Sequence, residues 1–144
     1  VFHARWHRWV MRKLPANTVM VKVKDIQWLA GLLEGEGSFT HYKRGQPCLQ
    51  VAMTDRWVID RVAHILDTRT RGPYRAKTSF YPDHVLWKTS LAGSAAAGWM
   101  MTLYILLSPR RQERIRQLLK QWREIPARPN MVWAQIHRRA KNSH

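Results

Sequence analysis

The sequence predicts a single α+β domain in which helices alternate with pairs of antiparallel strands. Three observations lead to this prediction: a length of 144 residues, an apolar content of 45%, and an alternation of stretches with helical and strand periodicity. A chain of this length has room for one core, and this apolar content is ordinary for a folded domain. The expected order is helix, two strands, helix, two strands and two helices.

The first helix and the first strand pair are predicted from a capping residue and from alternating side chains. Asp25 is expected to cap a helix that ends near Glu34 or Glu36. Two strands follow, over 38–44 and 48–54, and a turn-rich loop joins them. In the second strand, apolar and small or polar side chains alternate, which is typical of a sheet with one buried face.

The second half of the domain repeats this pattern. Asp55 is expected to cap a helix over 56–66, whose apolar residues recur at helical spacing. Pro109 suits the first turn of a helix, where its missing N–H is no loss. The remaining elements are expected at 73–78 and 84–91 for the strands and at 95–107 and 110–123 for the helices.

The chain is strongly basic. Lys and Arg number 25 against nine Asp and Glu, giving a formal net charge of +16, which indicates a polyanionic partner. Nucleic acid is favoured over an anionic membrane because the basic residues are spread through predicted strands and loops. An uncharged run over 89–109 suits a buried helix as well as a membrane span, and we expect no membrane association. Structural RNA-binding proteins share such a charge, so the charge alone does not indicate an enzyme.

The flanking segments and the cysteine content suggest where the protein acts. We expect the domain to cover 25–125, with a basic aromatic N-terminal extension over 1–24 and a basic segment over 126–144. The extension lacks the apolar region and cleavage site of a secretory signal. Cys48 is the only cysteine, so the chain has no internal disulfide. These features predict an intracellular protein of the cytoplasm, nucleoid or an organelle, and not a secreted one.

The stretch LAGLLEGEG, over 29–37, is the most informative part of the sequence. Gly31 and Gly35 are four residues apart, so they share one helix face and allow a second backbone to approach closely. Glu34 and Glu36 fall at the carboxyl end of the same helix, where unpaired carbonyl groups disfavour a carboxylate unless a cation is near.

This stretch resembles the signature helix of the LAGLIDADG homing endonucleases, and the resemblance covers about residues 25–125. The two aspartates of the family motif correspond here to Glu34 and Glu36. The motif occurs once, and because two such helices must pack together, the resemblance implies the single-motif, homodimeric type. The matching residues are Leu29, Ala30, Gly31, Leu32, Gly35 and Gly37.

The resemblance implies an αββαββα fold with a saddle-shaped antiparallel sheet that binds double-stranded DNA. It also implies site-specific double-strand cleavage of a long, pseudo-palindromic target by metal-dependent hydrolysis. The cofactor would be Mg²⁺ or Mn²⁺, with Ca²⁺ as a substitute that does not support cleavage. Mg²⁺ is bound through one or two carboxylates, and the family position of the metal ligand is Glu36, whereas Glu34 is expected to act as a structural cap.

The resemblance and the strand pattern together give candidate residues for each role. The expected catalytic residues are Glu36, Gln50 and either Arg110 or Arg111, and the expected dimer interface is Leu29, Gly31, Leu32 and Gly35. Alternate residues of a two-stranded ribbon can face the major groove. The expected DNA contacts are His41, Lys43, Arg44, Gln46, Gln50, Arg69, Arg71, Arg75, Lys77 and Lys88.

Three functions remain open at this point. The first is the homing endonuclease, the second is a maturase that binds intron RNA and assists its splicing, and the third is a DNA-binding regulator that does not cleave. All three need a basic surface, but only the first needs Glu36 and a divalent metal.

Overall fold

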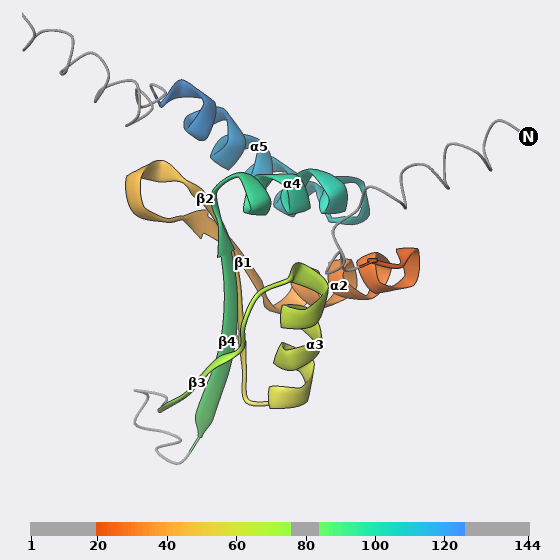
Figure 1. Cartoon of the computed structure of the whole chain (residues 1–144). Helices are drawn as coiled ribbons and strands as arrows, with labels where there is room; N and C mark the ends of the chain where they lie inside the picture. Colours follow the sequence, from red (N-terminus) through yellow and green to blue (C-terminus); the bar gives the residue numbers. More distant parts are fainter. Residues whose placement is uncertain (1–19, 76–83, 126–144) are drawn as a thin grey trace, which may run out of the picture.

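The computed structural model describes residues 20–75 and 84–125, and the labels below follow Figure 1. Residues 1–19 of the N-terminal extension, the segment 126–144 and the candidate DNA contact Lys77 lie outside the described residues.

The described elements follow the order expected from the sequence, so that prediction is confirmed. Two short 3₁₀ turns interrupt it: η1 (Lys43–Gly45) between the first two strands, and η2 (Tyr104–Leu106) between the last two helices. The helices and strands are α2 (Val23–Glu36), β1 (Gly37–His41), β2 (Pro47–Met53), α3 (Arg56–Leu66), β3 (Arg71–Arg75), β4 (Val85–Ala92), α4 (Gly93–Leu103) and α5 (Pro109–Glu124).

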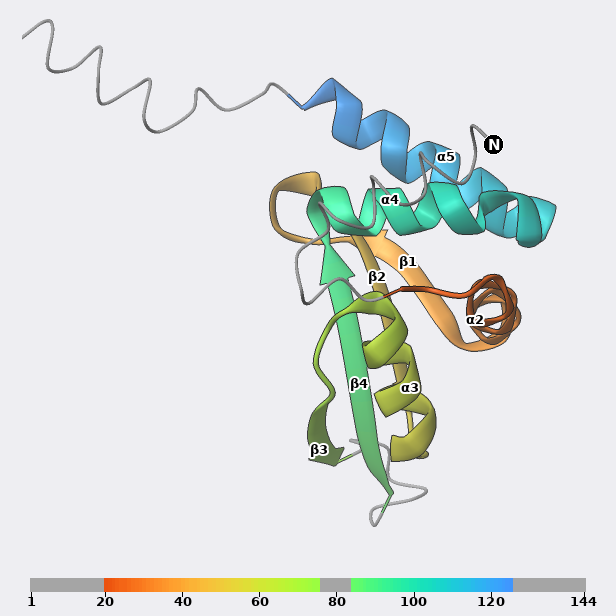
Figure 2. The same ribbon diagram turned by 45° about the vertical axis from the view of Figure 1, so that its right-hand side comes forward.

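The four strands form one antiparallel sheet with the order β1-β2-β4-β3. Its register aligns Ser38, Gln50 and Ser90 in one row across the three neighbouring strands. The adjacent row, which contains Phe39 and Leu49, therefore points to the opposite face. Helices α3, α4 and α5 pack on this second face, and the views in Figures 1 and 2 show the first face without a helix over it.

One hydrophobic core fills the space between the sheet and the helices. Each of the four described α-helices contributes buried apolar side chains to it, and the sheet contributes residues of β1 and β2. Burial of these side chains is the main stabilising term for a domain of this size. The core includes Leu29, Leu33, Phe39, Leu49, Val51, Ile59, Val62, Met100, Leu103, Ile115 and Leu118.

The start of the first described helix differs from the prediction. Helix α2 begins at Val23, and its N-cap position is Lys22, which makes no side-chain cap. Asp25 lies inside the first turn, where its carboxylate accepts a hydrogen bond from Arg61 of α3 at 3.3 Å. The predicted cap was therefore wrong, because a tertiary ion pair engages the carboxylate and its place in the first turn already suits the helix dipole.

The second helix begins as predicted. The Asp55 carboxylate accepts hydrogen bonds from the backbone N–H groups of Trp57 and Val58, at 2.9 and 3.4 Å. Pro109 is likewise the first residue of α5, as expected. The first strand is shorter than predicted: it ends at His41 because Arg44 and the residue after it turn the chain with positive φ angles of 62° and 73°.

Candidate nucleic-acid interface and catalytic centre

The carboxyl end of α2 passes into the edge strand β1 without a loop. Glu36 is the last helical residue and Gly37 is the first strand residue. A Cβ atom on Gly37 would lie 2.6 Å from the carbonyl oxygen of Leu33, which is too close for any side chain. The φ angle of Gly37 is −76°, so the close approach, and not a left-handed backbone, requires glycine here. The junction therefore holds Glu36 at the corner between helix and sheet.

Glu36 is exposed at this corner. Its carboxylate makes no hydrogen bond or ion pair with any residue in the described part of the chain. Within the described ranges there is also no group of three or more His, Cys, Asp or Glu side chains that could enclose a metal ion. The chain thus presents one open carboxylate here, which could serve as part of a shared, oxygen-rich site.

Glu34 has a different environment. Its two carboxylate oxygens accept hydrogen bonds from the backbone N–H of Ser108, at 3.0 Å, and from the Ser108 hydroxyl, at 2.7 Å. These bonds lower the pKa of Glu34, and the nearby charges of Arg111 and Arg110 lower it further. Because Ser108 is the N-cap of α5, Glu34 lies at the positive end of that helix. Glu34 therefore caps the amino end of α5.

Helix α5 places two arginines against the corner. Arg111 donates a hydrogen bond to the carbonyl of Glu34 at 2.9 Å, and its guanidinium lies 5.6 Å from the ring centre of Phe39. Arg114 donates through Nε to the carbonyl of Phe39 at 3.1 Å. Arg111 was a predicted catalytic residue, whereas Arg114 was missed. The spacing of three residues between them places both on one face of α5 and is a signal that could have found Arg114.

The predicted catalytic residues are therefore only partly brought together. Arg111 lies at the end of α2 beside Glu34, and Arg110 is exposed at the start of α5, near enough for its charge to act on Glu34. The Nε atom of Arg111 is buried without a hydrogen-bond partner in the described part of the chain. Gln50 lies on β2 opposite Ser38. No hydrogen bond joins Gln50 to Glu36 among the described residues.

We call the helix-free side of the sheet the open face. Its central row consists of Ser38, Gln50 and Ser90, and the next row pairs Lys88 with Arg71. The ammonium group of Lys88 lies 4.3 Å from the ring centre of Tyr74 on the same face. Small and polar side chains leave the backbone of this face accessible, and three predicted DNA contacts, Gln50, Lys88 and Arg71, share it.

The other predicted DNA contacts lie at the two ends of the sheet. His41, Lys43, Arg44 and Gln46 are exposed at the end where β1 turns into β2. Arg69 precedes β3 and Arg75 is its last residue, and both are exposed. The pairing of Arg75 with Val85 places it in a row of the opposite parity to that of Lys88. Arg75 is therefore exposed on the face opposite to that of Lys88 and lies outside the rows of the open face.

The acidic residues of the described chain are confined to helices and helix caps. None of the described strands, nor η1, contains an Asp or Glu residue. The acidic residues of the described chain lie in α2, α3 and α5 or in the positions that cap α3. An extended polyanion could therefore lie along the open face without meeting a carboxylate, apart from the one at the corner.

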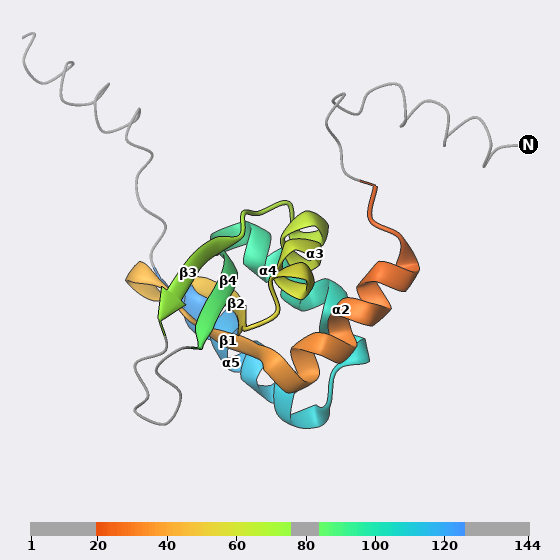
Figure 3. The same cartoon turned by 90° about the horizontal axis from the view of Figure 1, so that it is seen from below.

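Helix α2 has a small-residue face that no described side chain covers. Gly31 and Gly35 are exposed, and a Cβ atom on either would meet nothing within 4 Å. Figure 3 shows α2 at the border of the described fold. Leu32 is half-buried and packs against the core. Leu29, however, is 0% exposed and belongs to the protomer's own core, so its predicted place in a dimer interface is corrected.

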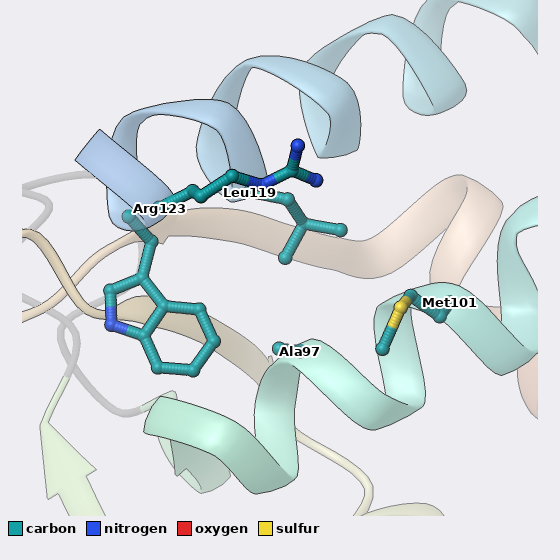
Figure 4. Close-up of a pocket in the computed structure, with 5 residues that line it drawn as sticks. Ala97, Met101, Leu119 and Arg123 are labelled. Atoms are coloured by element: carbon teal, nitrogen blue, oxygen red, sulfur yellow. The ribbon is translucent and has the colours of Figure 1, made fainter.

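An apolar groove of about 350 Å³ lies away from these residues, between α4 and α5. Figure 4 shows Ala97 and Met101 on one side of the groove and Leu119 and Arg123 on the other, and Trp122 of α5 also lines it. It contains none of the predicted site residues. Among residues 20–75 and 84–125, no helix is both long and apolar enough to span a membrane.

Comparisons with known proteins identify the fold. No protein-family model and no curated protein sequence matches the chain. A solved structure, that of the group I intron-encoded homing endonuclease I-CeuI complexed with DNA, matches with a TM-score of 0.52 at 15% sequence identity. The match covers 72% of this chain and 56% of the other, so the chain spans little more than half of that protein. That structure is a single-motif, homodimeric LAGLIDADG endonuclease, and this chain has its α+β fold.

Proposed function

We propose that this chain, which has the LAGLIDADG homing endonuclease fold, is a site-specific double-strand DNA endonuclease that acts as a homodimer. The observation on which the proposal rests is the position of Glu36. Glu36 is the last residue of α2, whose exposed face carries Gly31 and Gly35, and it directly precedes the edge strand β1. The described strands carry basic residues and no acidic ones.

The dimer would form through the exposed face of α2. Without a side chain at Gly31 or Gly35, a second copy of the helix can pack at close range. A two-fold axis through this contact makes the interface self-complementary and relates the two Glu36 residues to each other. The two open faces would then form one extended surface for a long, pseudo-palindromic DNA site.

The donor atoms at the corner fit a magnesium or manganese ion. Mg²⁺ usually takes one or two carboxylates, and phosphate oxygens and water complete its shell. Glu36 from each protomer offers a carboxylate that no described residue engages, so these two residues would hold the metal. When bound, such a metal lowers the pKa of an attacking water and neutralises charge on the scissile phosphate. Ca²⁺ would bind the same oxygens without supporting cleavage.

The other residues of the chain would orient and bind the DNA. Arg110 and Arg111, at the amino end of α5, would place positive charge near the phosphate, and Arg114 fixes α5 to the edge strand. Gln50 would act from the open face as a polar group beside the substrate. Phosphate contacts fix the register of a protein on DNA, and contacts to base edges provide specificity. The basic residues at both ends of the sheet would supply the phosphate contacts. Gln46 and Gln50 would contact base edges.

The test combines site selection with cleavage. DNA from a random-site library would be selected for binding in Ca²⁺ and then transferred to Mg²⁺, and the cut ends would be sequenced. We expect the wild type and the control Glu124→Gln, which changes another exposed glutamate, to cut the selected sites. Glu36→Gln should bind these sites within a few-fold of the wild type and leave them uncut. Cleavage at an unchanged rate by Glu36→Gln would reject the assignment, and binding without cleavage by the wild type would indicate a DNA-binding protein of the same fold.

A further inference from the structure

Two backbone hydrogen bonds hold the loop between β1 and β2. The backbone N–H of Tyr42 donates to the carbonyl of Gln46 at 2.7 Å, and that of Gly45 donates to the carbonyl of Tyr42 at 3.1 Å. Arg44 and Gly45 are consecutive residues in the left-handed region, with φ angles of 62° and 73°. Such a conformation is unfavourable for arginine, so surrounding contacts must maintain it.

One of these contacts comes from Ile125, the residue that follows α5. The Cδ1 atom of Ile125 lies 2.5 Å from the position that a Cβ atom on Gly45 would occupy, so the isoleucine side chain fills the space that glycine leaves. Figure 2 shows the carboxyl end of α5 above this loop. The backbone N–H of Ile125 donates to the carbonyl of Trp122 at 3.3 Å, which ties its position to the last turn of α5.

Ile125 is not part of the hydrophobic core. Its side chain is 40% exposed, and it does not belong to the cluster of buried residues that the helices share. Shortening it should therefore leave the fold intact while removing the contact with the loop. The loop in turn presents Lys43, Arg44 and Gln46, which are exposed.

We infer that Ile125 is a positioning residue for nucleic-acid recognition, because it holds the β1–β2 loop in the conformation in which Lys43, Arg44 and Gln46 meet the DNA. The inference rests on the proposed DNA-binding function. Without the isoleucine the loop would sample more conformations, and binding would then include the entropy of ordering it. The affinity for DNA should fall, because a smaller fraction of the free protein has the loop conformation that binds DNA.

The chemistry of cleavage should be unaffected. Strand β1 separates the loop from Glu36, and its five residues correspond to a distance of about 17 Å at the usual rise of a strand. A change at Ile125 should therefore weaken binding without changing the cleavage rate of DNA that is already bound. A residue with a merely structural role would lower both together through loss of folded protein.

The experiment compares Ile125→Ala with the conservative Ile125→Val and with the control Ile105→Ala, which shortens an isoleucine that is 81% exposed in η2. In the free protein we expect amide hydrogen exchange at Gly45 to be about tenfold faster in Ile125→Ala. Exchange should change little in Ile125→Val and not at all in Ile105→Ala. On selected DNA, Ile125→Ala should bind about three- to tenfold more weakly, with an unchanged single-turnover cleavage rate.

The two measurements separate the possible failures. Unchanged exchange at Gly45 in Ile125→Ala would overturn the inference, whether or not the protein binds DNA. Faster exchange together with unchanged DNA affinity would overturn the role in recognition. If the wild type bound no DNA site, the proposed function would fail, and the exchange result alone would decide whether Ile125 holds the loop.

Discussion

At the residue scale, two glutamates two positions apart have opposite environments. Successive residues of a helix are 100° apart, so Glu34 and Glu36 point to nearly opposite sides of α2. Glu34 therefore meets the amino end of α5, and Glu36 remains exposed at the corner. The motif predicted both acids by position, and the role of Glu36 as metal ligand stays a prediction.

Arg114 shows what the sequence did not reveal at this scale. Its spacing from Arg111 indicates the face of α5 on which it lies, but its partner, the carbonyl of Phe39, is 75 residues earlier in the chain, and no local pattern predicts that contact. Leu29 shows a related error. It is two residues before Gly31 in the motif, so helical geometry alone places the two on different faces.

The Glu34 cap should make stability depend on pH. The pKa of Glu34 in the folded protein lies below its ordinary value, so the stabilisation is present above the unfolded pKa of about 4.3 and is lost as pH falls through the folded value. We expect Glu34→Gln to melt at a lower temperature than the wild type at pH 7. At pH 3 the two melting temperatures should be nearly equal. Thermal melts at both pH values measure this, and an equal difference at the two would contradict the cap.

At the element scale, capping chemistry predicted helices well where the cap acts locally. Asp55 caps α3 within its own turn, and the predicted bounds of 56–66 match the structure. Asp25 was misassigned because a residue on another helix, Arg61, binds its carboxylate. The first strand was predicted to end three residues too late, since the left-handed conformation of Arg44 depends on contacts that no local rule describes.

The exposed face of α2 gives a prediction about assembly. Gly31 is exposed and a Cβ atom there would meet nothing within 4 Å, so the fold should persist in Gly31→Leu, but the added side chain would block the approach of a second α2. We expect Gly31→Leu to sediment as a monomer and the wild type as a dimer. The control Ala95→Leu, at an exposed position of α4, should remain dimeric. A dimer of Gly31→Leu with unchanged stability would place the interface elsewhere.

At the scale of the whole molecule, the main electrostatic feature of the described chain is that its acidic residues lie in helices and helix caps and none lies in a strand. Composition predicted the net charge and the class of partner, and the predicted strand ranges already lack Asp and Glu, but only the fold shows which basic residues share one face of the sheet. The reason is that the strand register, which selects the residues of the open face, depends on long-range pairing.

Binding to DNA should therefore weaken steeply as salt is added. Each phosphate contact contributes a slope of about −0.9 to the plot of log affinity against log salt concentration, through release of counterions. We expect Lys88→Ala on the open face to remove about one phosphate contact from each protomer. The magnitude of the slope should then fall by about 0.9 for each protomer. Lys120→Ala, which removes an exposed charge from α5, should leave it nearly unchanged. A flat salt response of the wild type in a filter-binding titration would contradict the open face as the DNA site.

The most direct test of the account is the distance between the two copies of residue 36 in the assembled protein. A spin label attached to Glu36→Cys, in a chain that also carries Cys48→Ala to remove the buried native thiol, reports this distance by electron paramagnetic resonance. Helices that pack through small residues have axes about 8–10 Å apart, so we predict an interspin distance below about 20 Å. A distance well above this value, or the absence of dipolar coupling in a protein that still binds DNA as a dimer, would contradict a shared metal site at Glu36.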